Sequence, residues 1–234
     1  MANRCCLTRA FGMAALLLLL PVCVADEKQE RRQLPEGFGL AAKYPGDKGI
    51  AEDPDVVFVE DFEEKTLDEL FKRWEDIKGR RQMSFSDERP EGSAGRHSLL
   101  MRHIGGQSTG CHLYRRLLPG YDKLFVRFYV KFAPNCFPIH HFFHIGGYNP
   151  PTRWPQGGAG ERPRGDERFS VGVEPHGKAF EGFRWRKDGR LRINFLWLLL
   201  YITKAPQGYE SRVWFDQVIV AKCYIGPIKP PKKR

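Results

Sequence analysis

The chain has 234 residues, with 38 basic and 28 acidic side chains, giving a formal net charge of +10. That length is enough for one domain with a sizeable core. The absence of any C-x-x-C pair argues against a zinc knuckle or a thioredoxin-like centre. A basic protein suits an anionic partner such as an acidic polysaccharide, a nucleic acid or a lipid surface, although the charge could equally serve solubility alone.

Residues 1–25 have the pattern of a secretory signal. Arg4 and Arg9 give a basic start, and the apolar run "FGMAALLLLLPVCVA" ends in small residues, which predicts cleavage after Ala25. The run is too short for a good membrane span, and no later segment offers one. A lipoprotein with an acylated Cys23 is a weaker alternative. We therefore expect a secreted or periplasmic protein without a stable membrane anchor.

Three cysteines follow the signal, namely Cys111, Cys136 and Cys223. In an oxidising compartment three cysteines allow one disulfide and one free thiol, and the sequence does not identify the pair.

The next two segments differ in character. Residues 26–54 are polar with scattered Pro and Gly, which is typical of a linker or loose arm. Residues 66–79, "TLDELFKRWEDIKG", place Leu67, Leu70 and Trp74 at helical spacing and end in a glycine. This spacing predicts one short helix near 66–78.

Most of the remaining chain has the pattern of β-strands separated by turn signals such as "LPGYDK" and "KDGR". The predicted strands are 56–62, 97–103, 111–118, 124–132, 139–146, 168–174, 190–203 and 212–221. Many short strands with Gly/Pro turns predict an all-β fold, a sandwich or a barrel. No internal repeat or low-complexity block is present.

The clearest alternation is "LFVRFYVKF", residues 124–132. One face is apolar and predicts a core, while Arg127, Tyr129 and Lys131 share the other face. If the "CHLYRR" strand lies nearby, it adds a second face of alternating polar and aromatic residues, Tyr114 and Arg116 with His112. Two such strands would form a basic, aromatic groove; the alternative is an ordinary solvated face.

Three histidines, His140, His141 and His144, lie within "HHFFHIGG". Pro138 before them and the glycine pair after them favour a strand, in which His140 and His144 share one face and His141 lies on the other. No carboxylate occurs in the segment, so we expect no metal ion. A core or rim histidine is the ordinary alternative to a groove histidine that binds substrate or transfers protons.

Two further segments carry candidate chemistry. The connection 146–167 is rich in Gly, Pro and Arg, and its Trp154 could stack on a sugar ring while arginines clamp carboxylates. It has no phosphate-loop spacing. The carboxylates of "VFVEDFEE", residues 57–64, could serve glycoside hydrolysis, but a solvated strand end is favoured.

Several of these motifs together resemble a known family. They are "VVFVEDFEE", "LFVRFYVKF", "HHFFHIGGYNPP", "AGERPRGDERFSVGVEPHG", "RLRINFLWLLLYIT" and "RVWFDQVIVAKCYIGPI". The set is similar to secreted bacterial proteins with a concanavalin A-like jelly roll, distantly similar to polysaccharide lyase family 14. The resemblance covers roughly 55–228, leaving 229–234 as a basic tail, and it implies a jelly-roll β-sandwich.

The resemblance to the lyase implies residues that this chain mostly lacks. The family pattern has a lysine after the Gly-Gly turn, a Ser-x-Arg pair and a later Tyr-x-Tyr pair. Here Tyr148 replaces the lysine, Ser170 is kept, Gly172 replaces the arginine, and no Tyr-x-Tyr follows. The chain also lacks an internal segment of the family after Gly177.

These departures favour binding over catalysis. We expect binding of an acidic, uronate-containing polysaccharide, without a cofactor. The expected substrate-binding residues are Arg127, Lys131, His140, Tyr114, Arg116, Trp154 and Ser170. The alternative is an active lyase performing β-elimination, with Tyr148, His144 and Tyr129 as proton-transfer candidates. Nucleic-acid binding has only the charge in its favour, and a signal peptide argues against it.

Overall fold

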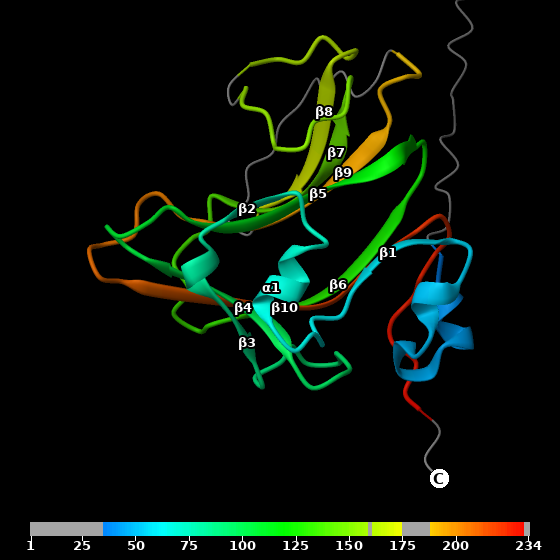
Figure 1. The fold of residues 1–234 in the computed structure, drawn as a ribbon, viewed down its shortest axis with the longest axis horizontal. Helices are drawn as coiled ribbons and strands as arrows, with labels where there is room; N and C mark the ends of the chain where they lie inside the picture. Colours follow the sequence, from blue (N-terminus) through cyan, green and yellow to red (C-terminus); the bar gives the residue numbers. More distant parts are fainter. Residues whose placement is uncertain (1–34, 159–160, 175–187, 232–234) are drawn as a thin grey trace, which may run out of the picture. The chain divides into compact units, whose positions relative to one another are not determined.

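Two antiparallel β-sheets make up most of the protein in a computed structural model that describes residues 35–158, 161–174 and 188–231 (Figure 1). The predicted signal, the start of the predicted arm and the last residues of the basic tail lie outside these ranges. Within them, no helix has the length and apolar character needed to cross a membrane. The prediction of a mostly β, sandwich-like protein is confirmed.

Each sheet has five strands, which we call sheet A and sheet B. Sheet A contains β1 (Val56–Glu60), β3 (Met83–Ser86), β4 (Ser98–Ile104), β6 (Phe125–Phe132) and β10 (Glu210–Ala221). Sheet B contains β2 (Asp76–Lys78), β5 (Gly110–Tyr121), β7 (His141–Tyr148), β8 (Arg168–Val173) and β9 (Ile193–Tyr201). The long β10 pairs with β1, β4 and β6, and sheet B has the order β2-β5-β9-β7-β8. All eight predicted strands are present with shifted ends, whereas the short β2 and β3 were missed.

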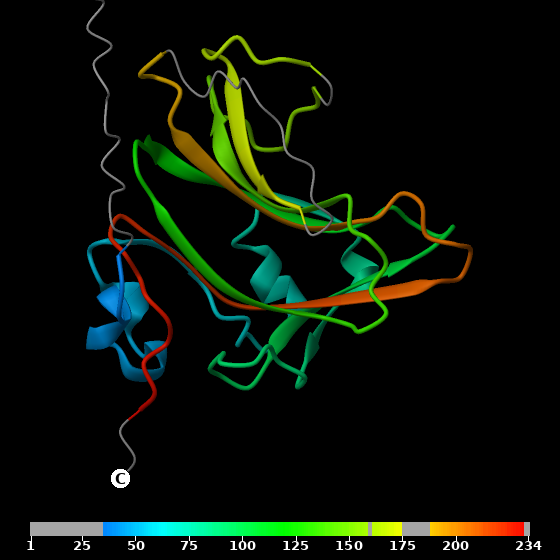
Figure 2. The same cartoon turned by 180° about the vertical axis from the view of Figure 1, so that it is seen from behind.

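The main core lies between the two sheets (Figure 2). The alternation predicted for β6 is confirmed, because Val126, Phe128 and Val130 pack against this core. Phe128 also stacks on Phe143 of β7 with ring centroids 4.8 Å apart, so the ring contact joins one sheet to the other. Stacked aromatic pairs of this kind add to the free energy gained from burial.

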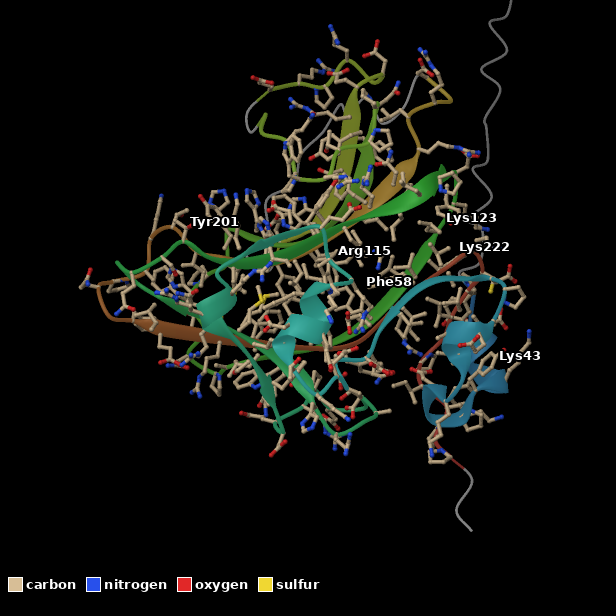
Figure 3. All side chains as sticks on the ribbon, in the orientation of Figure 1. Lys43, Phe58, Arg115, Lys123, Tyr201 and Lys222 are labelled. Carbon is tan, nitrogen blue, oxygen red and sulfur yellow. The ribbon has the colours of Figure 1, made fainter. Side chains whose placement is uncertain are left out.

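One cation enters this interior from β5. Figure 3 shows Arg115 between the two sheets, beside Phe58, and its guanidinium lies 4.1 Å from the centre of the Phe58 ring. Its neighbours Tyr114 and Arg116 belong to the opposite face of the strand, as the period of two requires. Burial lowers the pKa of the Arg115 guanidinium, opposed by the nearby carboxylates of Glu75 and Glu60.

The predicted helix is much shorter than its apolar spacing indicated. α1 covers only Leu67–Phe71, and Thr66 caps it by accepting a 3.2 Å hydrogen bond from the Glu69 N–H. After Phe71 the chain makes tighter turns, and residues 76–78 pair with β5 as β2. Leu70 and Trp74 are both buried, so the apolar pattern marked core residues correctly while the pairing with β5 ended the helix early.

Residues 35–54 are not a loose arm. They form three short 3-10 turns, η1 (Gly39–Lys43), η2 (Pro45–Asp47) and η3 (Ile50–Glu52), and a fourth, η4 (Arg80–Gln82), precedes β3. Backbone hydrogen bonds of 2.8 Å join Leu40 to Tyr224 and Ala41 to Ile225. A second apolar cluster contains Leu40, Ile50, Ile219, Ala221 and Ile225. The few apolar residues of this polar segment, together with its backbone hydrogen bonds, thus pack the segment onto β10 and residues 224–225.

The cysteine prediction can also be compared with the structure. Cys111, Cys136 and Cys223 are all free thiols, and Cys111 is buried in the main core. Burial raises the pKa of the Cys111 thiol to about 12, against opposing effects from Arg102, so this thiol is unreactive at neutral pH.

Candidate functional site

A cavity of about 390 Å³ lies on the face of sheet B that points away from the core. β7, β8 and β9 supply its floor, and residues of the 149–167 connection form one wall. On β9, Leu196 and Leu198 belong to the core, so the alternating Phe195 and Trp197 face the cavity. A concave site with a few polar groups is the usual setting for ligand binding.

The cavity floor is a cluster of aromatic rings. Tyr148 stacks on Phe195 with centroids 5.0 Å apart, and Tyr114 lies beneath them, 5.5 Å from Phe195. The Tyr114 hydroxyl donates a 3.0 Å hydrogen bond to the Thr152 carbonyl, which ties the 149–167 connection to the sheet. Tyr114 is fully buried, so it supports the floor and does not line the cavity.

Tyr148 and Arg168 hold the wall of the cavity in place. The Tyr148 hydroxyl accepts a 3.1 Å hydrogen bond from the Gln156 N–H, and burial raises the pKa of this phenol, with smaller opposing effects. Tyr148 is therefore a proton donor and not a base at neutral pH. Arg168 donates to the Gly157 carbonyl at 2.5 Å and to Glu161 Oε2 at 2.9 Å.

A cluster of two histidines and one glutamate lies at the edge of the cavity. Glu174 Oε1 is 3.0 Å from Nδ1 of His141 and 2.9 Å from Nε2 of His144. Burial opposes ionisation of Glu174, but the contacts with both histidines outweigh it and lower the pKa of this carboxyl to about 2. Glu174 is thus an anion at any physiological pH.

The structure corrects two expectations for the histidine segment. A register shift between His141 and Phe143 in the β7–β9 pair brings His141 to the same side as His144, and both Phe142 and Phe143 enter the core. The segment also meets a carboxylate, because Glu174 follows β8, the neighbour of β7. The reason for expecting no metal ion, the lack of a carboxylate, therefore does not hold.

The predicted basic groove is not formed, because β5 and β6 belong to different sheets. Arg127 is ion-paired with Asp47 and donates a 3.1 Å hydrogen bond to the Gly226 carbonyl. The Tyr129 hydroxyl accepts a 2.9 Å hydrogen bond from the Ile228 N–H, and Lys131 is 2.7 Å from Glu88. The N-terminal turns and the C-terminal segment lie beside each other at this side of sheet A (Figures 1 and 2).

Some of the other predicted site residues line the cavity and some do not. Ser170 lines it together with His144 and Tyr148, so three predicted residues come together there. The remaining predicted residues of sheet B and its loops, Arg116, Trp154 and His140, are not among its lining residues. Arg116 instead forms hydrogen bonds of 2.9 and 3.1 Å with the Glu75 carboxylate, and Trp154 is 59% exposed.

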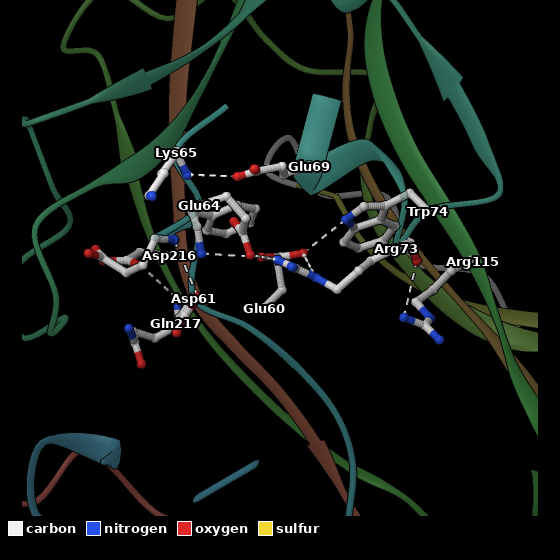
Figure 4. Close-up of polar contacts among 12 residues, drawn as sticks. Glu60, Asp61, Glu64, Lys65, Glu69, Arg73, Trp74, Arg115, Asp216 and Gln217 are labelled. Atoms are coloured by element: carbon white, nitrogen blue, oxygen red, sulfur yellow. Dashed lines mark hydrogen bonds and ion pairs between the residues drawn. The ribbon is translucent and has the colours of Figure 1, made fainter. Parts of the chain in front are cut away.

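Two of the carboxylates in residues 57–64, Glu60 and Glu64, share an ion pair with Arg73 and do not belong to a solvated strand end (Figure 4). Glu60 is fully buried and accepts a 2.5 Å contact from Arg73 and a 3.1 Å hydrogen bond from the Trp74 indole. Arg73 also pairs with Glu64. Arg73 joins both carboxylates, so this cluster links the end of β1 to the segment that contains α1.

The cavity residues that sequence reasoning missed include Gln156, Glu161, Arg168, Phe195 and Trp197, and it also missed the neighbouring Glu174. One usable signal was present. In "INFLWLLL" the aromatic residues alternate with leucines, which indicates a strand whose second face is aromatic as well as apolar. The contacts of Glu174 depend on the pairing of β7 with β8, and those of Arg168 on the path of the preceding connection, and no local pattern indicates either.

The described residues thus define a mostly β, sandwich-like protein with an aromatic cavity on the outer face of one sheet. Comparison of the chain with protein-family models, with curated proteins and with solved structures found no match. The site is therefore characterised by its own geometry and chemistry.

Proposed function

We propose that the cavity on sheet B binds one or two sugar units of an acidic, uronate-containing polysaccharide. The observation that carries the proposal is the combination of an aromatic floor, Tyr148, Phe195 and Trp197, with polar groups at its rim in one cavity of about 390 Å³. Aromatic faces pack against the apolar face of a sugar ring, while hydroxyl, imidazole and guanidinium groups hydrogen-bond its substituents.

The preference for an anionic sugar rests on charge. The chain has a formal net charge of +10, and Arg168 lies in the cavity wall with a side chain that is 19% exposed. Arg168 is paired with Glu161, whose side chain is 73% exposed. A uronate carboxylate can replace Glu161 on the Arg168 guanidinium, and such charge-assisted contacts are stronger than neutral ones.

The wider expectations belong to the same proposal. Two packed antiparallel sheets are compatible with the concanavalin A-like jelly roll that the sequence motifs suggest. A secreted or periplasmic location follows from the predicted signal in residues 1–25 and suits a protein that meets extracellular polysaccharide.

Lyase activity on the same polymer is the second candidate, and the contact between His144 and Glu174 favours it. In β-elimination a base removes the C5 proton of the uronate, the C4–O bond breaks, and an acid protonates the departing oxygen. His144, oriented by Glu174, could act as the base, and the protonated Tyr148 could act as the acid. Tyr129 belongs to β6 of sheet A and lies outside this cavity, so it has no part in this scheme.

The test compares two tryptophans. Calorimetric titration with a uronate oligosaccharide should give binding to the parent protein and more than a tenfold loss for Trp197→Ala. Trp154→Ala, at an exposed tryptophan outside the cavity, is the control and should bind as the parent does. Equal affinity for all three proteins would refute the proposal. Ultraviolet absorbance from newly formed unsaturated ends would select the lyase over simple binding.

A further inference from the structure

We propose that His141, His144 and Glu174 form a binding site for one divalent transition-metal ion of the zinc class. The inference does not depend on the proposed sugar binding, because it rests on the side chains of these three residues alone. Their potential ligand atoms, two imidazole nitrogens and one carboxylate oxygen, all lie within 4.8 Å of one another.

The distances are close to those of a metal centre. Zinc lies about 2.1 Å from its nitrogen and oxygen ligands, so two ligands of a tetrahedral ion are roughly 3.4 Å apart. Glu174 Oε1 is 3.0 Å from His141 Nδ1 and 2.9 Å from His144 Nε2. A shift of about half an ångström in these side chains would therefore admit the ion.

The backbone presets this arrangement. His144 and Gly172 are paired across β7 and β8, and Glu174 follows directly after the last residue of β8, two residues beyond Gly172. His141 reaches the group because of the register shift between β7 and β9. Aromatic rings pack against both imidazoles. The ring centroids are 5.6 Å apart for His141 stacked on Tyr201, and 5.4 Å apart for His144 and Trp197.

The ligand types select the ion. Two imidazoles with one carboxylate suit zinc and its neighbours, whereas calcium and magnesium prefer sites made of oxygen ligands. Three protein ligands are typical of zinc sites that take a fourth ligand from solvent or substrate. The side chains of His141, His144 and Glu174 are 34%, 14% and 24% exposed, so an ion can reach them from solution.

A simpler explanation is a carboxylate that accepts two ordinary histidine hydrogen bonds. That explanation accounts for the distances, but it leaves Glu174 Oε2 buried without a hydrogen-bond partner among the described residues. A buried carboxylate oxygen without a partner is costly, and a metal ion nearby would offset part of that cost. The two explanations differ in what zinc does to the protein.

The experiment titrates zinc into the untagged, metal-free protein without any sugar. We expect one zinc ion per chain, with an affinity that falls at least about a hundredfold in Glu174→Gln and in His144→Ala, since even outer-shell partners of a zinc ligand contribute tenfold to a hundredfold. His97→Ala is the matched control. His97 is 3.1 Å from Asp87, a histidine–carboxylate pair with no third ligand in the described part of the chain, and its loss should leave zinc binding unchanged.

Cobalt supplies a second readout on the parent protein, which does not require the variants to fold. Bound cobalt should give visible absorption bands typical of nitrogen and oxygen ligands in tetrahedral geometry. A thiolate-to-cobalt charge-transfer band would instead place the ion on cysteines and would overturn the proposal. No zinc binding by the parent at micromolar concentration, or unchanged affinity in Glu174→Gln, would overturn it as well. Sugar affinity measured separately keeps the two proposals distinguishable.

Discussion

Gly172 lies opposite His144 in the β7–β8 pair, and a Cβ added at position 172 would be 3.1 Å from Cε1 of His144 and 3.2 Å from Oε1 of Glu174. The same position is where the resemblance to polysaccharide lyase family 14 implies an arginine. The glycine therefore leaves the space in which the histidine and the glutamate meet. A histidine–carboxylate cluster occupies this edge of the sheet.

Filling that space should disturb the cluster without unfolding the protein. Gly172 is exposed on β8, an edge strand of sheet B, and a valine there suits a strand. We expect Gly172→Val to lower zinc affinity more than tenfold while the melting temperature changes by only a few degrees. The measurement is a zinc titration beside a thermal melt. Gly189→Val is the control, because an added Cβ there meets no atom of the described residues within 4 Å; unchanged zinc affinity in Gly172→Val would contradict the prediction.

Arg127 should prove to be structural and not a sugar-binding residue. Its side chain is 12% exposed and that of Asp47 is 3% exposed, so removing the arginine leaves a nearly buried carboxylate unpaired. Breaking such a pair typically costs about 3–5 kcal/mol in the free energy of unfolding. We expect Arg127→Gln to approach that loss in urea denaturation.

The neighbouring Lys131 supplies the control for this experiment. Lys131 is 41% exposed and pairs with Glu88, which is 47% exposed, so Lys131→Gln should change the free energy of unfolding by less than about 1 kcal/mol. Neither variant should change uronate affinity, because both side chains lie outside the cavity. A large loss of sugar binding in a stably folded Arg127→Gln protein would instead support a sugar-binding site on sheet A.

Asp216 should make the protein less stable as the pH rises. This carboxyl is fully buried on β10, and burial raises its pKa to about 7, opposed mainly by hydrogen bonds from Ser93 and the Gln217 N–H. Between about pH 4 and pH 7 the folded protein holds a proton that the unfolded chain has released. The contribution of Asp216 is therefore present at low pH and is lost as the pH rises through 7.

The size of this effect follows from the shift in pKa. One pKa unit corresponds to about 1.36 kcal/mol, so the free energy of unfolding should fall by up to roughly 4 kcal/mol over that range. Asp216→Asn, which cannot ionise, should reduce the slope of this dependence in urea denaturation series between pH 4 and pH 8, while Glu60, whose pKa burial also raises to about 7, should retain part of it. If the free energy of unfolding of the variant fell equally steeply with pH, the dependence would come from other titratable groups.

The sequence predicted what depends on local periodicity. The apolar face of β6 and the strand pattern of β7 and β9 follow from spacing along one strand, and each is present. The length of the helix at Leu67 could not be predicted this way, because pairing of residues 76–78 with β5 ended it.

The site depended on contacts between distant positions. Glu174 is 30 residues from His144, and the register shift that turns His141 toward it changes the parity of the strand by one residue. Arg127 meets Asp47 across 80 residues, so a solvated cation and a paired one have the same local pattern. Alternation identifies which residues share a face, but it does not identify what covers that face.

The last prediction concerns the ion pair between Arg168 and Glu161 in the cavity wall, which are 2.9 Å apart. If a uronate carboxylate replaces Glu161 on the guanidinium, then Glu161→Gln should raise uronate affinity several-fold, because the ligand no longer competes with a protein carboxylate. Arg168→Gln should lower the same affinity by about tenfold, and both effects should weaken as salt screens the charges. A neutral oligosaccharide of the same length is the control ligand, for which Glu161→Gln should bind as the parent does. Calorimetric titrations of the parent and both variants with each oligosaccharide, at low and at high salt, measure these affinities. If Glu161→Gln weakens uronate binding, or if the affinity does not depend on salt, then the cavity does not recognise the sugar through its charge.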